Sequence, residues 1–433
     1  MESYTRITSI TNDITTSYVN TIWRLNDKAF TRNRKMNYES LVKTMILKKG
    51  QTLSLELDEI TTSMNIQKIS KQAYSKQRMN LNPKIFKHLN EKYIKRIYDE
   101  IDVKKYKGYI ILAVDGSIIE LPNSNELKEY YGLSEGQKGS VGRVRARGLG
   151  IYDCLNKIMI NSNIDPYKIS EKEQLIKLLD DVKKFYNNEK ILMVFDRYYC
   201  GIAFINLLEE KGIKYLIRMR DKSYKREKAE MKSDDEEVNL RVRTNAIFYA
   251  KGEELEKLKG KKYVNTRIIK IKIGKKKTEE QLCTNLTKEE LTKEEAKDLY
   301  FVRWNIEKAF DVIKNKINIE NFSSKKVIGI EQEFYAQMMV YNMLEDINRD
   351  IEIENKKGRK YKYKTNMNIL AGIFKRKFVE VLLSPTAEES AQKYKEMIEQ
   401  MKQYVVPIKP GREFPRRRMH SMNKYRSNLR RNI

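Results

Sequence analysis

The run Tyr109–Gly116, YIILAVDG, decides the fold of this chain. Its apolar residues follow one another without polar alternation, which is typical of a β-strand buried on both faces. Asp115 follows the run directly, and we expect the strand to end there. A carboxylate in that place is costly unless it is paired or binds a metal, although many such residues only cap a turn. Gly116 permits a turn or the close approach of a ligand.

A second stretch repeats this pattern, because the apolar run 191–195 (ILMVF) is followed at once by Asp196. Between the two runs, residues 149–160 alternate well enough for strands that pair antiparallel with the first, and a helix is expected at about 170–186. A helix to about 210 and a strand at 215–220 follow. Ligands of α/β sheets bind at the carboxyl ends of strands, so we expect Asp115 and Asp196 at one edge of the sheet.

The third informative stretch is Tyr300–Lys314, YFVRWNIEKAFDVIK, which reads as one amphipathic helix after a capping box at 292–295. At about 100° per residue, four functional side chains share an arc roughly 60° wide, and the apolar residues gather on the far side. These four are Tyr300, Arg303, Glu307 and Lys314. Taken alone, the stripe is better explained as a solvated charged face that contains an Arg303–Glu307 pair, and the rest of the chain changes that interpretation.

Composition narrows the classes of function. The 433 residues contain 87 Lys and Arg against 59 Asp and Glu, a net charge of +28, which favours a polyanion such as nucleic acid as partner. The alternative is lysine enrichment from an AT-rich genome. No apolar run is long enough to span a membrane, and three dispersed cysteines indicate a reducing cytoplasm. Only two histidines are present, which excludes a His-rich zinc site.

Residues 1–104 are predicted to form a helical DNA-binding domain. Within it, Leu55–Arg78 has the layout of a helix-turn-helix, and its second helix carries side chains suited to phosphates and base edges. These side chains are Lys71, Gln72, Lys76, Gln77 and Arg78. A plain helical hairpin with a basic face is the alternative.

The remaining chain divides by its patterns. Residues 105–220 and 284–350 form the predicted catalytic core, and residues 221–283 interrupt it as a β-rich insertion with strands at 241–250 and 264–273. Residues 351–433 are expected to be helical and basic. Their tail, Lys409–Ile433, has nine Lys and Arg against the single Glu413, and reads as a nucleic-acid-binding or solubilising arm. The glycine-spaced loop Lys138–Arg147 is also basic and is not a nucleotide P-loop.

Two strand-end aspartates and a helical glutamate, in the order Asp115, Asp196 and Glu307, suit two-metal phosphodiester chemistry. Carboxylate oxygens are hard ligands for Mg²⁺, with Mn²⁺ as a possible substitute. Two such ions about 3.5–4 Å apart can activate an attacking oxygen and stabilise a leaving one.

The spacing Tyr-x2-Arg-x3-Glu-x6-Lys in Tyr300–Lys314 resembles the signature of insertion-sequence DDE transposases of the YREK branch. VDGS at 114–117 and FDR at 195–197 resemble the first and second aspartate motifs of that family, and CTNL at 283–286 matches its return to the core. The resemblance covers about residues 105–350. It implies a ribonuclease H-like α/β core with a mixed sheet.

By this resemblance, two Mg²⁺ ions would be held by Asp115, Asp196 and Glu307, while Tyr300, Arg303 and Lys314 would contact DNA phosphates. The implied activity is cut-and-paste transposition, in which transposon ends are cleaved and the freed 3′-hydroxyl is joined to target DNA. The implied partners are terminal inverted repeats, target DNA and a second copy of the chain on paired ends. The implied location is a prokaryotic cytoplasm, in association with the nucleoid.

Two departures from the family pattern stand out. Tyr198 and Tyr199 follow Asp-Arg where relatives often have glycine, and residues 221–283 lack the tryptophan on which hairpin-forming relatives stack a flipped base. Phe248, Tyr249 or Tyr263 are candidates to replace it, and Trp304 is a candidate wall of the site. Two alternative functions remain open: a catalytically inactive regulator descended from a transposase, and a ribonuclease H-like structure-specific nuclease.

Overall fold

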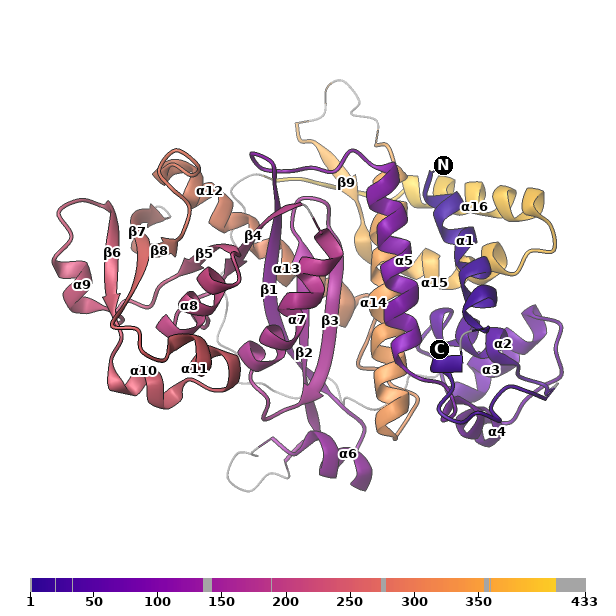
Figure 1. Cartoon of the computed structure of the whole chain (residues 1–433). Helices are drawn as coiled ribbons and strands as arrows, with labels where there is room; N and C mark the ends of the chain where they lie inside the picture. The colour runs from indigo at the N-terminus through magenta and orange to yellow at the C-terminus, as the bar shows by residue number, and fades with distance from the viewer. Residues whose placement is uncertain are drawn as a thin grey trace.

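The computed structural model describes residues 2–19, 21–32, 34–134, 142–187, 189–273, 278–353, 358 and 360–409. Its centre is an eight-stranded mixed sheet with the strand order β3-β2-β1-β4-β5-β8-β7-β6 (Figure 1). The strands are β1 (Tyr109–Glu120), β2 (Arg145–Asp153), β3 (Ile158–Pro166), β4 (Lys190–Phe195), β5 (Lys214–Arg218), β6 (Asp235–Arg241), β7 (Tyr263–Ile273) and β8 (Thr278–Thr284). The prediction of an α/β chain with a large mixed sheet is confirmed.

Parallel pairing is confined to the centre of the sheet, where β4 lies between β1 and β5. All other neighbours in this sheet pair antiparallel, including β2 with β1 and β3 with β2. The apolar runs that predicted β1 and β4 are buried because helices cover both faces of this central part.

β1 is longer than predicted. The strand does not end at Asp115 but continues to Glu120, because β2 keeps pairing with it as far as Glu120↔Arg145. Only the parallel ladder with β4 stops early, at Ala113↔Val194. Asp115 therefore lies within a strand that has lost one of its two neighbours.

Helices surround the sheet and extend beyond it at one end (Figure 1). The N-terminal ones are α1 (Glu2–Ser17), α2 (Tyr38–Ile46), α3 (Leu53–Ser63), α4 (Lys71–Arg78) and α5 (Lys84–Glu100), with a 3-10 turn at Thr21–Trp23. Those that follow are α6 (Asn125–Tyr131), α7 (Glu171–Tyr186), α8 (Ile202–Glu210), α9 (Lys225–Ala229), α10 (Thr244–Tyr249), α11 (Gly252–Leu258), α12 (Lys293–Val302), α13 (Trp304–Asn315), α14 (Val327–Asp350), α15 (Met367–Leu382) and α16 (Ala387–Lys402).

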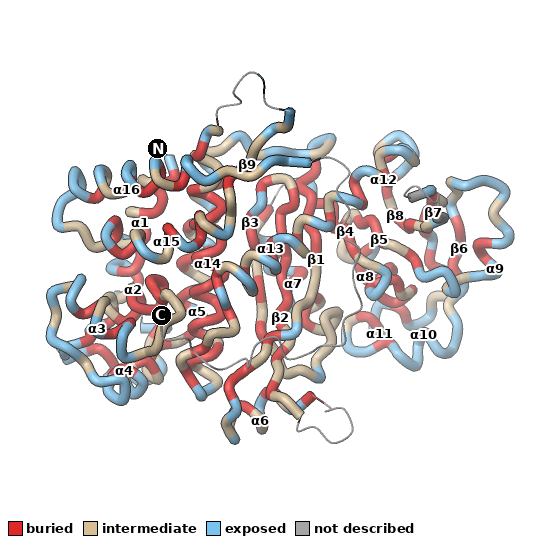
Figure 2. The backbone as a smooth tube through the Cα atoms, turned by 180° about the vertical axis from the view of Figure 1, so that it is seen from behind, coloured by how far each residue is buried: buried red, intermediate tan, exposed pale blue. Residues whose placement is uncertain are grey.

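The central helix α14 joins the N-terminal helices to the sheet, and Figure 2 shows it buried along most of its length. Two buried ion pairs hold this junction: Arg78 of α4 with Glu333 at 2.8 Å, and Arg6 of α1 with Asp346 at 2.9 Å. The predicted helix pair of the helix-turn-helix is confirmed as α3 and α4. Arg78, however, faces the interior, so its expected role in reading DNA is wrong for this structure.

The region 221–283 is less β-rich than predicted. The strand expected at 241–250 is wrong, since Thr244–Tyr249 forms the short helix α10. β6 and β7 pair from Asp235↔Ile269 to Arg241↔Tyr263. The segment that connects these two strands in the chain lies outside the sheet and contains α10 and α11. The strand expected at 264–273 is confirmed as β7. β8 then pairs with β5, so these strands extend the central sheet.

The C-terminal helices α15 and α16 are confirmed. A small antiparallel sheet pairs β9 (Tyr363–Thr365), which precedes α15, with β10 (Val405–Pro407), which follows α16. The predicted basic tail from residue 410 onward lies outside the described residues, as do residues 138–141 of the basic loop. Within the described ranges, no helix is long and apolar enough to cross a membrane.

Candidate active site

Asp115 and Asp196 lie at the same level of two neighbouring parallel strands. The last paired residues are Ala113 and Val194, and each aspartate is two positions further along its chain. Adjacent strands lie about 4.8 Å apart, and residues two apart point to the same face of a sheet. The sheet therefore brings the two predicted aspartates together at the carboxyl end of its parallel ladder.

The face toward which Asp115 points can be read from its partner on β2. Asp115 is paired with Gly150, and directly opposed residues of antiparallel strands share one face. A Cβ added to Gly150 would lie 3.1 Å from Phe310 of α13. Asp115 thus points toward the face covered by α13, the helix that carries Glu307.

The predicted continuous helix through Tyr300–Lys314 is broken at Arg303. α12 ends at Val302 and α13 begins at Trp304, with Arg303 as the shared residue. The backbone tightens there, because the Arg303 N–H donates to the Tyr300 carbonyl at 3.2 Å rather than four residues back. The break lets α12 pack on β7 while α13 packs on β1 and α14.

Arg303 is the central cation of the site. Its side chain is buried, and Nη2 donates to Glu307 Oε1 at 2.8 Å. The guanidinium also lies 5.2 Å from the ring of Trp304. Burial opposes its charge, but the hydrogen bond with Glu307 and the charges of Tyr300 and Asp115 raise the pKa of Arg303. Nε of Arg303 is buried and has no hydrogen-bond partner among the described residues.

Neighbouring carboxylates act on Asp115. Burial raises the pKa of Asp115 to about 7; Arg303 opposes this shift, and Glu171, Glu307 and Asp196 add to it. These charges act on Asp115 because their carboxylates lie near it. Asp115 and Asp196 each accept a local backbone hydrogen bond, from Gly116 at 3.0 Å and from Tyr198 at 2.8 Å.

Glu171 is the site residue that the sequence interpretation missed. It begins α7, and its carboxylate accepts a hydrogen bond from Arg147 of β2 at 3.1 Å. The helix at 170–186 was predicted, but its first residue comes near Asp115 only through tertiary packing. The available signal was Gly116, whose missing side chain permits the close approach of another group.

The three predicted DNA-contacting residues have different environments. Tyr300 and Arg303 are only 3% and 5% exposed. Lys314 is more accessible, and its Nζ donates to the Ile118 carbonyl of β1 at 2.6 Å and pairs with Glu320 at 3.5 Å. Phosphate contact by Tyr300 or Arg303 would therefore require local rearrangement, whereas Lys314 needs only a change of rotamer.

The site suits a hard divalent cation in its chemistry more than in its present arrangement. Its donors are carboxylate oxygens alone, and burial leaves their charges poorly compensated, as the raised pKa of Asp115 shows. In the described part of the chain, however, no three His, Cys, Asp or Glu side chains are arranged so that they could hold a metal ion together. Binding would thus draw the carboxylates closer, at the expense of the Arg303–Glu307 pair.

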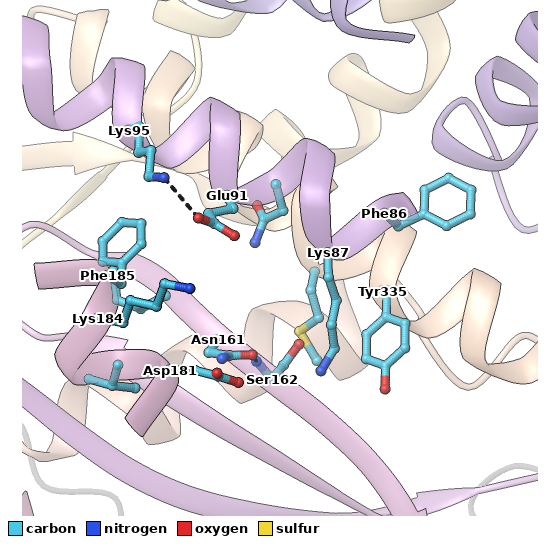
Figure 3. Close-up of a pocket in the computed structure, with 14 residues that line it drawn as sticks. Phe86, Lys87, Glu91, Lys95, Asn161, Ser162, Asp181, Lys184, Phe185 and Tyr335 are labelled. Carbon is cyan, nitrogen blue, oxygen red and sulfur yellow. Dashed lines mark hydrogen bonds and ion pairs between the residues drawn. The ribbon is translucent and has the colours of Figure 1, made fainter. Parts of the chain in front are cut away.

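A cavity of about 340 Å³ lies elsewhere, between α5, β3, α7 and α14 (Figure 3). Lys87 reaches into it and lies 4.6 Å from the ring of Tyr335, and burial lowers the pKa of Lys87 to about 8. None of the four carboxylates lines this cavity. This cavity is therefore separate from the carboxylate site at the end of the β1–β4 ladder.

Comparison with protein families shows that residues 106–343 match the family described as Transposase DDE domain. The chain belongs to this family. The matched residues include Asp115 and Asp196, the insertion and the whole of α12 and α13. Comparison with curated proteins gave no match. Among solved structures, the piggyBac transposase in a synaptic complex with hairpin DNA is similar over 92% of this chain and 83% of its own, at 11% identity and a TM-score of 0.41. Membership of the transposase DDE domain family therefore rests on the sequence match.

Proposed function

We propose that this transposase moves DNA by a cut-and-paste mechanism, with a ribonuclease H-like core that uses two divalent cations, normally Mg²⁺. The strand order β3-β2-β1-β4-β5, with α7 between β3 and β4, supports such a core. The observation that carries the proposal is the level placement of Asp115 and Asp196 beyond the β1–β4 ladder, beneath the helix that carries Glu307.

In this proposal Asp115, Asp196 and Glu307 hold the cations. When bound, the cations would lower the pKa of the attacking hydroxyl or water and neutralise charge on the leaving oxygen. The chain's own contribution is to fix the three carboxylates on rigid elements and to keep bulk water away from Asp115. Arg303 neutralises part of their charge until cations and DNA bind.

We assign Arg303, Tyr300 and Lys314 to the DNA phosphates near the scissile bond. Arg303 is buried beside Glu307 and has an unsatisfied Nε–H, so a phosphate oxygen would complete its hydrogen bonds. Lys314 would exchange the Ile118 carbonyl for a phosphate. The chemistry is an in-line displacement at phosphorus, first by water and then by the freed 3′-hydroxyl on target DNA.

The partners in this proposal are double-stranded transposon ends, target DNA and a second copy of the chain. The exposed side of α4, with Lys71, Gln72 and Lys76, is suited to contact DNA. In the insertion, Phe248 and Tyr249 are 78% and 76% exposed, which supports them over the less exposed Tyr263 as a surface for stacking a base.

The test is cleavage of a labelled duplex that carries the inverted repeat flanking the gene, in the presence of Mg²⁺. We expect Asp196→Ala to abolish strand cleavage while the protein still binds the duplex, because the change removes a cation ligand and no DNA contact. The exposed Asp180→Ala on α7 serves as the matched control and should cut like the wild type. Cleavage by Asp196→Ala at the wild-type rate would refute the assignment.

A further inference from the structure

Glu171 approaches the backbone of β1 immediately beside Asp115. A Cβ added to Gly116 would lie 2.2 Å from Glu171 Cδ and 2.3 Å from its Oε1. Gly116 is not among the glycines with positive φ, so its backbone would accept another residue. The absence of a side chain at position 116 therefore serves to make room for the carboxylate of Glu171.

One oxygen of the Glu171 carboxylate is hydrogen-bonded to Arg147, and the other is available to a ligand. Arg147 donates through Nη1 to Oε1 of Glu171, and through Nη2 to the Tyr167 carbonyl at 3.3 Å. Oε2 of Glu171 accepts no hydrogen bond from any side chain or backbone group that the structure describes. An ion pair with Arg147 would alone explain the position of Glu171, but it leaves one oxygen available to a further partner.

A buried hydroxyl marks the same place. Tyr199 is 1% exposed, and within the described ranges its hydroxyl has no hydrogen-bond partner. Burial raises the pKa of Tyr199, and the charges of Glu171, Asp115 and Asp196 raise it further, so its phenol lies near these carboxylates. Buried hydroxyl groups are normally hydrogen-bonded, and an unpaired one beside carboxylates points to a missing polar group.

We propose that Glu171 is a fourth cation-holding carboxylate of the active site, next to Asp115 and Asp196. This inference rests on the proposed function. Asp115, Asp196, Glu307 and Glu171 carry four negative charges when ionised, and Arg147 and Arg303 supply two positive ones. The site therefore keeps an excess of negative charge that favours the binding of divalent cations. Arg147 fixes the carboxylate, and Gly116 gives it access to the edge where Asp115 lies.

The inference is tested by titrating the full-length protein with Mn²⁺ in the absence of DNA, using calorimetry and the electron paramagnetic resonance signal of free Mn²⁺. We expect Glu171→Gln to weaken Mn²⁺ binding by about tenfold or more. Glu254→Gln is the matched control, since Glu254 of α11 is a buried acid that pairs at 3.8 Å with Lys172 of α7, the helix that also carries Glu171. It should bind Mn²⁺ like the wild type.

A second variant separates loss of charge from misfolding. Gly116→Ala keeps every charge but places a methyl group where the Glu171 carboxylate lies, so it should weaken Mn²⁺ binding to a similar extent. If both changes act through Glu171, the double variant should be little worse than either single one. Additive losses would show that Gly116→Ala acts directly on Asp115.

Asp196→Asn separates the role proposed for Glu171 from the existence of the cation site. If Asp196→Asn weakens Mn²⁺ binding and Glu171→Gln does not, the role given to Glu171 is refuted while the proposed active site stands. If neither change affects Mn²⁺ binding, the proposed cation site itself is refuted. Weaker binding in both variants, with the Glu254 control unchanged, supports a site with four carboxylates.

Discussion

At the scale of the residue, the position of Asp115 lowers the free energy of unfolding at neutral pH. Its pKa is raised from the ordinary value of an aspartate to about 7, because partial burial and the charges of Glu171, Glu307 and Asp196 outweigh the opposing charge of Arg303. A carboxyl group whose pKa is raised by folding stabilises the protein below its unfolded pKa. That stabilisation is lost as the pH rises through the folded pKa.

We therefore expect the cation-free protein to lose stability between about pH 4 and pH 7 through this group. Asp115→Asn should reduce that loss and raise the melting temperature at pH 8 relative to the wild type, with little difference at pH 4. Thermal unfolding in chelator at both pH values measures the effect. Equal pH dependence in the two proteins would show that Asp115 is not the strained carboxyl.

Lys314 offers a second test at the residue scale. If it binds a DNA phosphate, Lys314→Ala should weaken end binding and reduce the slope of log K against log salt by about one. Lys308→Ala is the control, since Lys308 is exposed on the same helix and, within the described part of the chain, donates to Asn305 alone. An unchanged slope would restrict Lys314 to joining α13 and β1.

At the scale of the element, local signals predicted local structure well. The unbroken apolar runs predicted β1 and β4, and the capping box predicted at Thr292 marks the start of α12. Features decided by distant partners were missed. β1 continues past Asp115 because β2 pairs with it, and Glu171 reaches Gly116 only once α7 has packed on the sheet.

The breaks in the pattern have the same origin. The helical phase of Tyr300–Lys314 was continuous in sequence, but α12 and α13 pack on different strands, so the chain bends at Arg303. Residues 241–250 have a composition compatible with a strand, but the β6–β7 ladder ends at Arg241, and residues 244–249 form α10. The order of the acids was predictable from the sequence, whereas their mutual distances depend on the whole fold.

The basic side chains of helix α4 differ in exposure. Lys76 is exposed, whereas Arg78 at the end of the same helix is buried against α14. We expect Lys76→Ala to weaken binding to duplex DNA without lowering the melting temperature, as electrophoretic mobility shifts and thermal unfolding would show. Lys393→Ala on α16 is the control. Unchanged binding by Lys76→Ala would remove α4 from the DNA interface.

At the scale of the whole molecule, the N-terminal helices and the sheet are joined by charge buried against α14. Although burial opposes ionisation, Lys48 and Arg78 hold the pKa of Glu333 well below its usual range. Ser323 also donates to this carboxylate, through its backbone N–H at 2.9 Å. This buried network therefore connects α4 and the segment after α2 to the helix that packs on the sheet.

Removing one partner of this network should be costly. We expect Arg78→Ala to destabilise the protein by about 3–5 kcal/mol, because it leaves Glu333 buried with less compensation. Chemical denaturation measures this loss. Arg143→Ala, which breaks the more exposed pair with Glu120, should cost no more than about 1 kcal/mol. Equal effects of the two changes would contradict a structural role for the α4–α14 junction.

The central claim is that the carboxylates at the end of the β1–β4 ladder hold the cations of strand cleavage. Asp196→Cys tests it most directly, because a thiolate binds Mg²⁺ poorly and accepts softer ions such as Mn²⁺ more readily. Cleavage of the labelled transposon end should be lost in Mg²⁺ and regained, at least in part, in Mn²⁺. Cleavage by Asp196→Cys in Mg²⁺ at the wild-type rate would contradict the account.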